Sequence, residues 1–456
     1  MYRFAMRRLE DWKSSPHQKP LLIEGARQVG KSWLMKEFGA ANYHQTLKVD
    51  FNQDEDNPHA GRLQTIFSGD LHPERIIAAL ELEYDISIDP DNTLLIFDEI
   101  QEVPRALTSL KYFNEDAPQY QILAAGSQMG ITLHQGASFP VGQVSSLKLY
   151  PMNFDEFLYA TERKRFAELL DAGDWQMAET FKETYREALI EYYLIGGMPE
   201  VVAGFCRDRD FRQARITQLE LLKGYRRDYS KHAPALLNAR IQEVFNSIPQ
   251  HLAKENKKFV WGAIRPGARS RDFELAVQWI VDCAQAYKVP LLEQPIQPIE
   301  TYCNQEIFKL YLHDVGLLCA MYGVDPQIAL DEDSVFREFK GTLTEQYVLQ
   351  QLEYLIENDP FMSGPAYWTG AKSEVDFIIQ ANGLVVPIEV KATFNLKSKS
   401  LQAYINKYHP EQAFRTSLHG YHVREDFTDI PLFAILHVTS PLTATQTSPQ
   451  TSPQTS

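Results

Sequence analysis

Residues 21–38 read LLIEGARQVGKSWLMKEF, and this stretch decides the fold of the N-terminal part of the chain. Its apolar start predicts a buried strand, and its second half suits a helix. Between them, Gly25, Gly30, Lys31 and Ser32 satisfy the spacing G-x-x-x-x-G-K-[ST]. Glycines let the backbone curl until successive N–H groups face one point, and the helix presents its positive N-terminal end there. The spacing therefore predicts a phosphate-binding loop rather than a plain glycine turn.

The loop is expected to grip the phosphates of a nucleotide. Lys31 would reach the β- and γ-phosphates, and Ser32 would be a ligand of Mg²⁺. The residues expected to bind the nucleotide are Gly25, Ala26, Arg27, Gln28, Val29, Gly30, Lys31 and Ser32.

A second half of this site is expected at the end of the apolar run TLLIFDE, residues 93–99. Asp98 would hold the metal, and Glu99 would polarise the attacking water. The alternative is a pair of solvated acids at a strand end. Ser127 ends the run YQILAAGS and is a candidate sensor of the γ-phosphate, although a serine there is often only a cap or turn residue.

Four short apolar runs alternate with helical patterns between residues 19 and 150. They are PLLIEG, HQTLKVDF, TLLIFDE and YQILAAGS. This alternation predicts a parallel α/β sheet covered on both faces. After residue 154 the pattern becomes helical, and the glycines of GGMP at residues 196–199 interrupt it.

Several motifs together resemble the AAA-type P-loop ATPase family of bacteria and archaea. They are the loop of residues 21–38, LLIFDEIQEVPRALTSLKYFNE, AAGSQMG, FPVGQVSSLKLYPMNFDEFL and YYLIGGMPEVV. The resemblance implies ATP hydrolysis with Mg²⁺, so ATP and Mg²⁺ are the expected cofactors. Lys31, Glu99 and Ser127 are the catalytic residues expected from the motifs above. Members of the family join this ATPase to a C-terminal domain of unknown function with a nuclease-like core.

The region of residues 236–300 contains two amphipathic helical patterns and is predicted to be a winged-helix module, as the resemblance also implies. A basic cluster lies in it, in a chain whose net charge is -15. Such a cluster could track the phosphates of DNA, and the alternative is a solvated loop on a protein-docking module. The cluster consists of Lys254, Lys257, Lys258, Arg265, Arg269 and Arg271.

The C-terminal stretch EVDFIIQANGLVVPIEVKA, residues 374–392, is expected to be a hairpin. Asn-Gly at residues 382–383 is a strong two-residue turn. If it closes the hairpin, Asp376 lies opposite Glu389, and Glu374 faces Lys391. Two opposed carboxylates repel unless water or a cation separates them, so a divalent metal is one way to resolve the conflict.

This pattern is similar to the D…(D/E)-x-K arrangement of the restriction-nuclease-like fold, the PD-(D/E)xK class. Glu345, on the preceding helical stretch, resembles the first acid of that fold. The resemblance implies a second metal site at Glu345, Asp376 and Glu389, with Lys391 beside it. The alternative is a charged solvent face of an ordinary hairpin, and such cores also persist as inactive binding platforms.

The bulk composition sets the remaining expectations. The four cysteines are scattered, which fits a reduced cytoplasmic protein without a structural zinc. The N-terminal residues lack the continuous apolar region of a signal peptide, and no stretch of about 18 apolar residues predicts a membrane span. The tail of TSPQ repeats is low in complexity and too polar to bury.

The sequence as a whole predicts an ATPase that acts on DNA through its winged-helix and nuclease-like modules. The alternative is a nucleotide-dependent switch that binds a protein partner, has an inactive nuclease-like domain and cuts nothing. A homo-oligomer or a protein partner is among the expected partners. The expected domains are the ATPase (1–155), a helical lid (156–235), the winged-helix module (236–300), the nuclease-like domain (301–440) and a disordered tail (441–456).

Overall fold

The computed structural model describes residues 1–16, 18–53, 56–126, 140–326, 336–392 and 398–437. The chain divides into two compact units. The N-terminal unit holds residues 2–151 together with residues 274–285, and the C-terminal unit holds residues 152–273 and the chain from Ala286 onward, with Met1. The regions expected to be lid, winged helix and nuclease-like domain therefore fall mostly within one unit.

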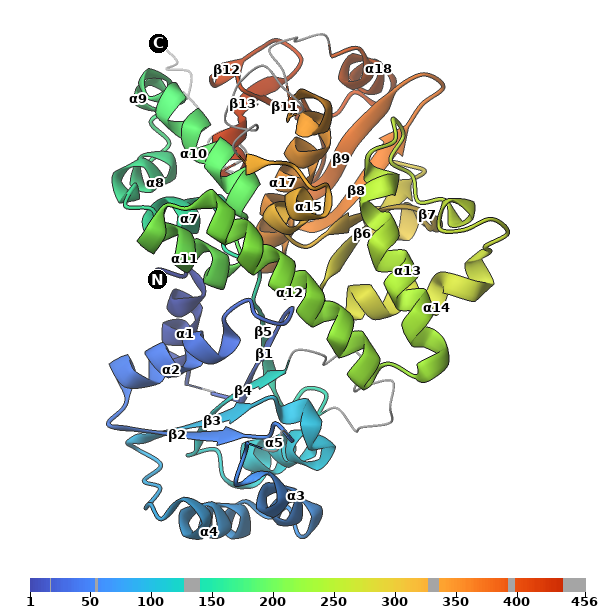
Figure 1. Ribbon diagram of the computed structural model, residues 1–456. Helices are drawn as coiled ribbons and strands as arrows, with labels where there is room; N and C mark the ends of the chain where they lie inside the picture. Colours follow the sequence, from blue (N-terminus) through green and yellow to red (C-terminus); the bar gives the residue numbers. More distant parts are fainter. Residues whose placement is uncertain (17, 54–55, 127–139, 327–335, 393–397, 438–456) are drawn as a thin grey trace, which may run out of the picture. The chain divides into compact units, whose positions relative to one another are not determined.

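The N-terminal unit is built on a five-stranded sheet in which every pairing is parallel (Figure 1). The strand order is β2-β3-β4-β1-β5. The four apolar runs identified in the sequence are strands, as predicted, whereas the fifth strand was not predicted. The strands are β1 (Leu21–Glu24), β2 (Gln45–Asp50), β3 (Thr93–Asp98), β4 (Gln121–Gly126) and β5 (Ser145–Lys148).

Helices cover both faces of this sheet, as the alternating pattern predicted. On one face, Phe51, Phe67, Phe97 and Phe113 form a chain of edge-to-face rings with centroids 5.2–6.3 Å apart. The helix after β1 packs so closely that a Cβ on Gly39 would press on side chains of β2 and β3. The helices are α1 (Ala5–Ser14), α2 (Lys31–Asn42), α3 (Ala60–Ser68), α4 (Pro73–Tyr84) and α5 (Pro104–Asp116), with a 3₁₀ turn η1 (Ile100–Glu102).

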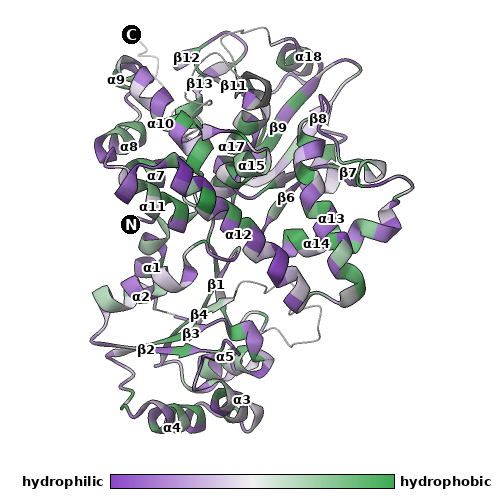
Figure 2. Ribbon diagram, viewed as in Figure 1, coloured by the Kyte–Doolittle hydropathy of each residue, from purple (hydrophilic) through white to green (hydrophobic). Residues whose placement is uncertain are grey.

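The C-terminal unit begins with helices, as the pattern after residue 154 predicted. They are α7 (Phe154–Ala160), α8 (Lys164–Asp171), α9 (Trp175–Thr180), α10 (Lys182–Ile195), α11 (Pro199–Asp208), α12 (Phe211–His232) and α13 (Ala235–Leu252). Figure 2 shows hydrophobic and hydrophilic residues along the long helix α12. Ala214, Leu221 and Tyr225 of α12 are buried, while Ile216 and Leu219 are exposed. No helix in the described ranges has the length and apolar character that a bilayer span requires.

The glycines between α10 and α11 allow a close approach of backbone to backbone. Gly196 has a φ of 76°, and a Cβ on Gly197 would overlap the Met152 carbonyl. The amide of Met152 donates to the Gly197 carbonyl at 2.7 Å, and the Tyr192 hydroxyl donates to the Met152 carbonyl. The amide of Gly197 donates to a carboxylate oxygen of the buried Asp314 at 2.6 Å. These contacts fix the first residues of the C-terminal unit.

An eight-stranded mixed sheet forms the rest of the C-terminal unit, in the order β12-β13-β11-β10-β9-β8-β6-β7. The boundary expected near residue 300 falls between β6 and β7, which pair with each other in this sheet. The strands are β6 (Ala286–Leu292), β7 (Cys303–Leu312), β8 (Ser363–Thr369), β9 (Glu374–Ala381), β10 (Leu384–Val390), β11 (Phe414–Ser417), β12 (His422–Val423) and β13 (Thr428–Pro431). The helical segments are η2 (Trp261–Ala263), η3 (Ile299–Tyr302), α15 (Val315–Met321), α17 (Phe336–Asn358), α18 (Lys399–Tyr408) and η4 (Leu432–His437). The helix α14 (Ser270–Asp282) begins in this unit, but its residues from Glu274 onward belong to the N-terminal unit.

Candidate nucleotide site and carboxylate cluster

The glycine-rich loop joins β1 directly to α2, in the strand–loop–helix order that the sequence predicted. Gly25 has a φ of 142°, and a Cβ there would overlap the Leu149 carbonyl. Gly30 is the N-cap of α2 with a φ of 96°, a left-handed conformation that only glycine adopts at little cost. Both glycines are therefore required by the backbone path itself.

Lys31 is buried and folds back over the loop. Its Nζ donates to the carbonyls of Gly25 and Ala26, at 2.9 Å each. Burial lowers the pKa of Lys31 to about 8, although Glu99 and Asp98 act in the opposite direction. This ammonium group has neutral carbonyl partners, so an anion entering the loop would be a stronger acceptor.

Ser32, in the first turn of α2, and Asp98, at the end of β3, are in direct contact. The Ser32 hydroxyl donates to Asp98 Oδ1 at 3.0 Å. Sequence analysis missed Lys48, whose Nζ lies 2.8 Å from Asp98 Oδ2 and 2.7 Å from Asp50 Oδ2. The parallel register sets Asp50 beside Asp98, which places both aspartates within reach of this lysine. Asp98 is thus oriented through both of its carboxylate oxygens.

Two residues of the site have left-handed backbone conformations although they are not glycine. Glu99 has a φ of 52° and Gln28 a φ of 67°. The side chain of Gln101 donates to Glu99 Oε2 at 2.7 Å. Such conformations cost free energy and often occur at functional sites, where the surrounding structure enforces them. Ser127, the proposed γ-phosphate sensor, lies outside the described residues.

Arg3 is a further residue of this region that sequence analysis did not identify. It is buried and donates through Nη1 to the Val29 carbonyl at 2.9 Å and through Nη2 to the Tyr150 carbonyl at 2.7 Å. The partners are 26 and 147 residues away in the sequence, so no local pattern signals the contact.

The C-terminal hairpin has the register that the Asn-Gly turn predicted. Ala381 pairs with Leu384, and the antiparallel ladder continues as far as Phe377 and Ile388. Asn382 and Gly383 have φ angles of 49° and 75°, as the tight turn requires. Asp376 accepts a hydrogen bond from the Val390 amide at 2.8 Å.

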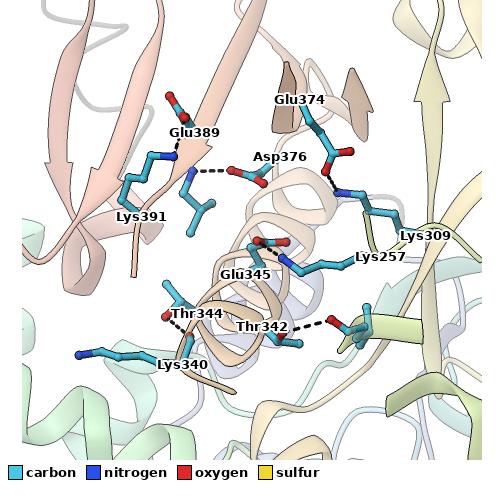
Figure 3. Close-up of polar contacts among 12 residues, drawn as sticks. Lys257, Lys309, Lys340, Thr342, Thr344, Glu345, Glu374, Asp376, Glu389 and Lys391 are labelled. Atoms are coloured by element: carbon cyan, nitrogen blue, oxygen red, sulfur yellow. Dashed lines mark hydrogen bonds and ion pairs between the residues drawn. The ribbon is translucent and has the colours of Figure 1, made fainter. Parts of the chain in front are cut away.

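Asp376 and Glu345 belong to a cluster of carboxylates and lysines (Figure 3). Lys257 is ion-paired with Glu345, which also accepts from the Tyr311 hydroxyl at 3.3 Å. Burial raises the pKa of Asp376 to about 7, and the negative charge of Glu345 adds to this effect. Burial opposes the ionisation of Glu345, but Lys257 and Lys309 outweigh it, so its pKa is lowered.

The hairpin register predicted that Glu374 faces Lys391, but these two residues have other partners. Lys309, a fully buried residue of β7, takes Glu374 as its partner at 2.5 Å. Burial acts to lower the pKa of Lys309, but Glu345, Glu374 and Asp376 outweigh it, so the net shift is upward. The sequence could not reveal this pair, because the two residues come from strands separated by β6 and β8 in the sheet.

Glu389 has partners of its own. It lies 2.7 Å from Lys391 and accepts from the Leu401 amide at 3.3 Å (Figure 3). Across the described ranges, no three His, Cys, Asp or Glu side chains are grouped so that they could hold a metal. The expected set of Glu345, Asp376 and Glu389 is therefore not assembled around one point here.

The residues of the basic cluster have separate environments. Lys257 is engaged with Glu345, and Arg265, which is exposed, lies 3.3 Å from Glu243. The side chains of Lys254, Arg269 and Arg271 are exposed. Only part of the cluster is therefore presented to solvent.

Comparison with known families identifies three segments. Residues 17–158 match the family model of an AAA domain. Residues 186–328 match a domain of unknown function (DUF8612), and residues 340–435 match another domain of unknown function (DUF4143). The chain thus contains an AAA-type P-loop ATPase domain followed by two domains whose family descriptions give no activity. The nuclease-like character of the C-terminal region stays a prediction.

Similar solved structures include three archaeal proteins. A Walker-type ATPase of Pyrococcus abyssi shares 15% identity, with 70% of this chain and 94% of that chain covered and a TM-score of 0.43. The Orc1 protein of Aeropyrum pernix, solved in complex with DNA, shares 13% identity over 71% of this chain and 92% of its own, with a TM-score of 0.28. Cdc6p of Pyrobaculum aerophilum shares 10% identity, with 72% of this chain and 93% of that chain covered and a TM-score of 0.24. The comparison with curated proteins gives no match.

Proposed function

We propose that this protein binds ATP with Mg²⁺ at the loop between β1 and α2 and hydrolyses it. The observation that carries the proposal is the 3.0 Å contact between the Ser32 hydroxyl and Asp98, beside the buried Lys31. Hydroxyl and carboxylate oxygens are ligands that Mg²⁺ accepts, so these two residues would hold the ion. The bound ion would neutralise charge on the β- and γ-phosphates.

Side chains and backbone amides of the protein would bind the phosphates and orient the attacking water. Lys31 would exchange its carbonyl partners for phosphate oxygens, and the loop amides would bind the phosphate chain. Glu99, held by its backbone at the end of β3, would orient the attacking water. Ser127 would contact the γ-phosphate.

Calorimetry tests the proposal most directly. The full chain is titrated with a non-hydrolysable ATP analogue in the presence of Mg²⁺, and phosphate release from ATP is measured in parallel. We expect one nucleotide bound per chain and turnover that requires the metal. Absence of any heat of binding under these conditions would refute the nucleotide site.

We also propose that the ATPase acts on DNA. Lys254, Arg269 and Arg271 offer exposed positive charge close together in the sequence of an otherwise acidic chain. A cavity of about 520 Å³ is lined by Lys254 and Lys372, together with Glu255, Glu374 and uncharged neighbours. Phosphate contacts of this kind are electrostatic, so they are expected to weaken with added salt.

DNA action is tested by the ATPase rate with and without single- and double-stranded DNA and RNA. Stimulation by DNA that declines with salt, and that is lost when Lys254, Arg269 and Arg271 are all changed to Ala, is the expected result. A rate unaffected by any nucleic acid would contradict it.

The second candidate function is a nucleotide-dependent switch that binds a protein and cuts nothing. It is favoured by the pairing of Glu345 with Lys257 and of Glu374 with Lys309, because lysine ammonium groups already neutralise these carboxylates. A nicking assay with Mg²⁺ or Mn²⁺ separates the candidates. Nicking that disappears in Asp376→Ala supports a nuclease, and a wild-type protein inert on DNA and RNA supports the switch.

A further inference from the structure

Arg3 sits at a position from which it can set the shape of the phosphate-binding loop. It lies just before α1 and has only 4% of its surface exposed. The Nη1 group donates to the carbonyl of Val29, the loop residue that precedes Gly30. Burying a guanidinium group is costly unless its donors are satisfied, so the contact is a specific feature of the fold.

The contact with Val29 has a consequence for the next amide. The peptide unit between Val29 and Gly30 is planar and trans, so its carbonyl and its N–H point in opposite directions. Arg3 holds the carbonyl, and the N–H of Gly30 is thereby aimed to the other side of the peptide. The left-handed φ of 96° at Gly30 then leads into α2, whose first N–H groups have no partners within the helix.

The second nitrogen of Arg3 fixes the loop against the strand beside it. Nη2 donates to the Tyr150 carbonyl, just after β5. The adjacent Leu149 amide donates to the Glu24 carbonyl at 2.7 Å, and the Leu149 carbonyl leaves no room for a side chain on Gly25. The loop is therefore held at its start by Leu149 and near its end by Arg3. The planar guanidinium group of Arg3 has several donors, so it can bind the Val29 and Tyr150 carbonyls at the same time. The ammonium group of a lysine cannot bridge the two carbonyls in the same way.

We propose that Arg3 is a positioning residue for the nucleotide site: it orients the Val29–Gly30 peptide so that the loop is pre-shaped for a phosphate chain. This inference rests on the proposed function, because it assumes that phosphate binds in the loop. A pre-shaped loop loses less binding free energy to its own ordering, so Arg3 acts on nucleotide affinity rather than on the chemical step.

The test compares Arg3→Met and Arg3→Lys with Arg7→Met, a control at an exposed arginine of α1. Dissociation constants for ADP and a non-hydrolysable ATP analogue are measured by calorimetry on the full chain, and KM and kcat for ATP by phosphate release. For Arg3→Met we expect both dissociation constants and KM to rise about 10-fold, with kcat changed less than about 3-fold. Arg3→Lys should fall between this variant and the wild type, and Arg7→Met should match the wild type.

The outcomes separate the inference from the function on which it rests. Wild-type affinity in Arg3→Met, or a loss confined to kcat, overturns the positioning role. If Arg3→Met does not fold, Arg3→Lys decides: weakened binding of both nucleotides supports the role, and wild-type binding overturns it. Lys31→Ala is run in parallel, because retained nucleotide affinity in that variant would refute the phosphate site itself and not the part played by Arg3.

Discussion

The loop after β1 and the cluster around Glu345 both bring lysines into buried surroundings, but they surround them with opposite kinds of partner. Lys31 has carbonyl partners, and burial lowers its pKa to about 8. Lys309 is also buried, yet three nearby carboxylates give it a raised pKa. Lys31 gains an ionic partner when an anion binds in the loop, whereas Lys309 already has carboxylate counter-ions. The contrast suggests a site built for a ligand and a site closed by its own side chains.

The largest effect expected from this comparison is that of Lys31→Ala. Removing the ammonium group from the loop should reduce ATP turnover at least about 100-fold, because electrostatic stabilisation of the transferred phosphate supplies much of the rate enhancement in such reactions. The measurement is phosphate release by the purified variant, with Lys36→Ala as a matched control elsewhere on α2. Near-normal turnover would show that Lys31 is not a phosphate ligand.

A similar loss of turnover, but without loss of binding, is expected for Glu99→Gln. The amide keeps the shape of the side chain but cannot act as a base, so kcat should fall about 100-fold while the nucleotide still binds. Single-turnover kinetics and calorimetry distinguish the two effects. Unchanged kcat would remove Glu99 from the role of orienting water.

Lys257→Met probes the other region. This change leaves Glu345 without its closest cation, and an uncompensated buried charge destabilises a protein by about 3 kcal/mol. A lower midpoint of thermal unfolding is the expected readout, and Lys257→Met combined with Glu345→Gln should recover part of the loss. Lys254→Met, at an exposed position, should have little effect. A midpoint unchanged in Lys257→Met would indicate that this ion pair does not contribute to stability.

The smallest effect concerns pH. Because the pKa of Asp376 is about 7 in the folded chain against 3.8 normally, the folded form holds a proton that the unfolded form has already released. This carboxyl therefore makes stability fall as the pH rises from about 4 to 7. Asp376→Asn can still accept from the Val390 amide, and its stability should fall less than that of the wild type between pH 4 and pH 8. Denaturation curves at both pH values measure it, and equal pH profiles would contradict the burial of a charge at this position.

Local patterns predicted much of this structure. The four apolar runs became β1 to β4, and the Asn-Gly turn fixed the register of β9 and β10. The strand β5 was not predicted, because its sequence is SSLK and only Leu147 in it is buried. The loop, Ser32 and Asp98 could be recognised because a motif and a strand end mark them.

Contacts between distant segments could not be predicted in this way. Arg3 and Lys48 look like ordinary charged residues in the sequence, and only the fold gives them partners at the nucleotide site. Likewise, the pairing of Glu374 with Lys309 rather than Lys391 depends on how β7 is placed in a sheet of eight strands. The sequence carries no periodicity from which such tertiary choices could be read.

The hydrogen bonds around residues 149–152 have a mechanical meaning. In the N-terminal unit, the Tyr150 carbonyl accepts a hydrogen bond from Arg3. In the C-terminal unit, the Met152 amide donates to the Gly197 carbonyl, and the Met152 carbonyl accepts from the Tyr192 hydroxyl. Within the N-terminal unit, a displacement of the loop at Val29 would therefore also act on the Tyr150 carbonyl, because one guanidinium group binds both.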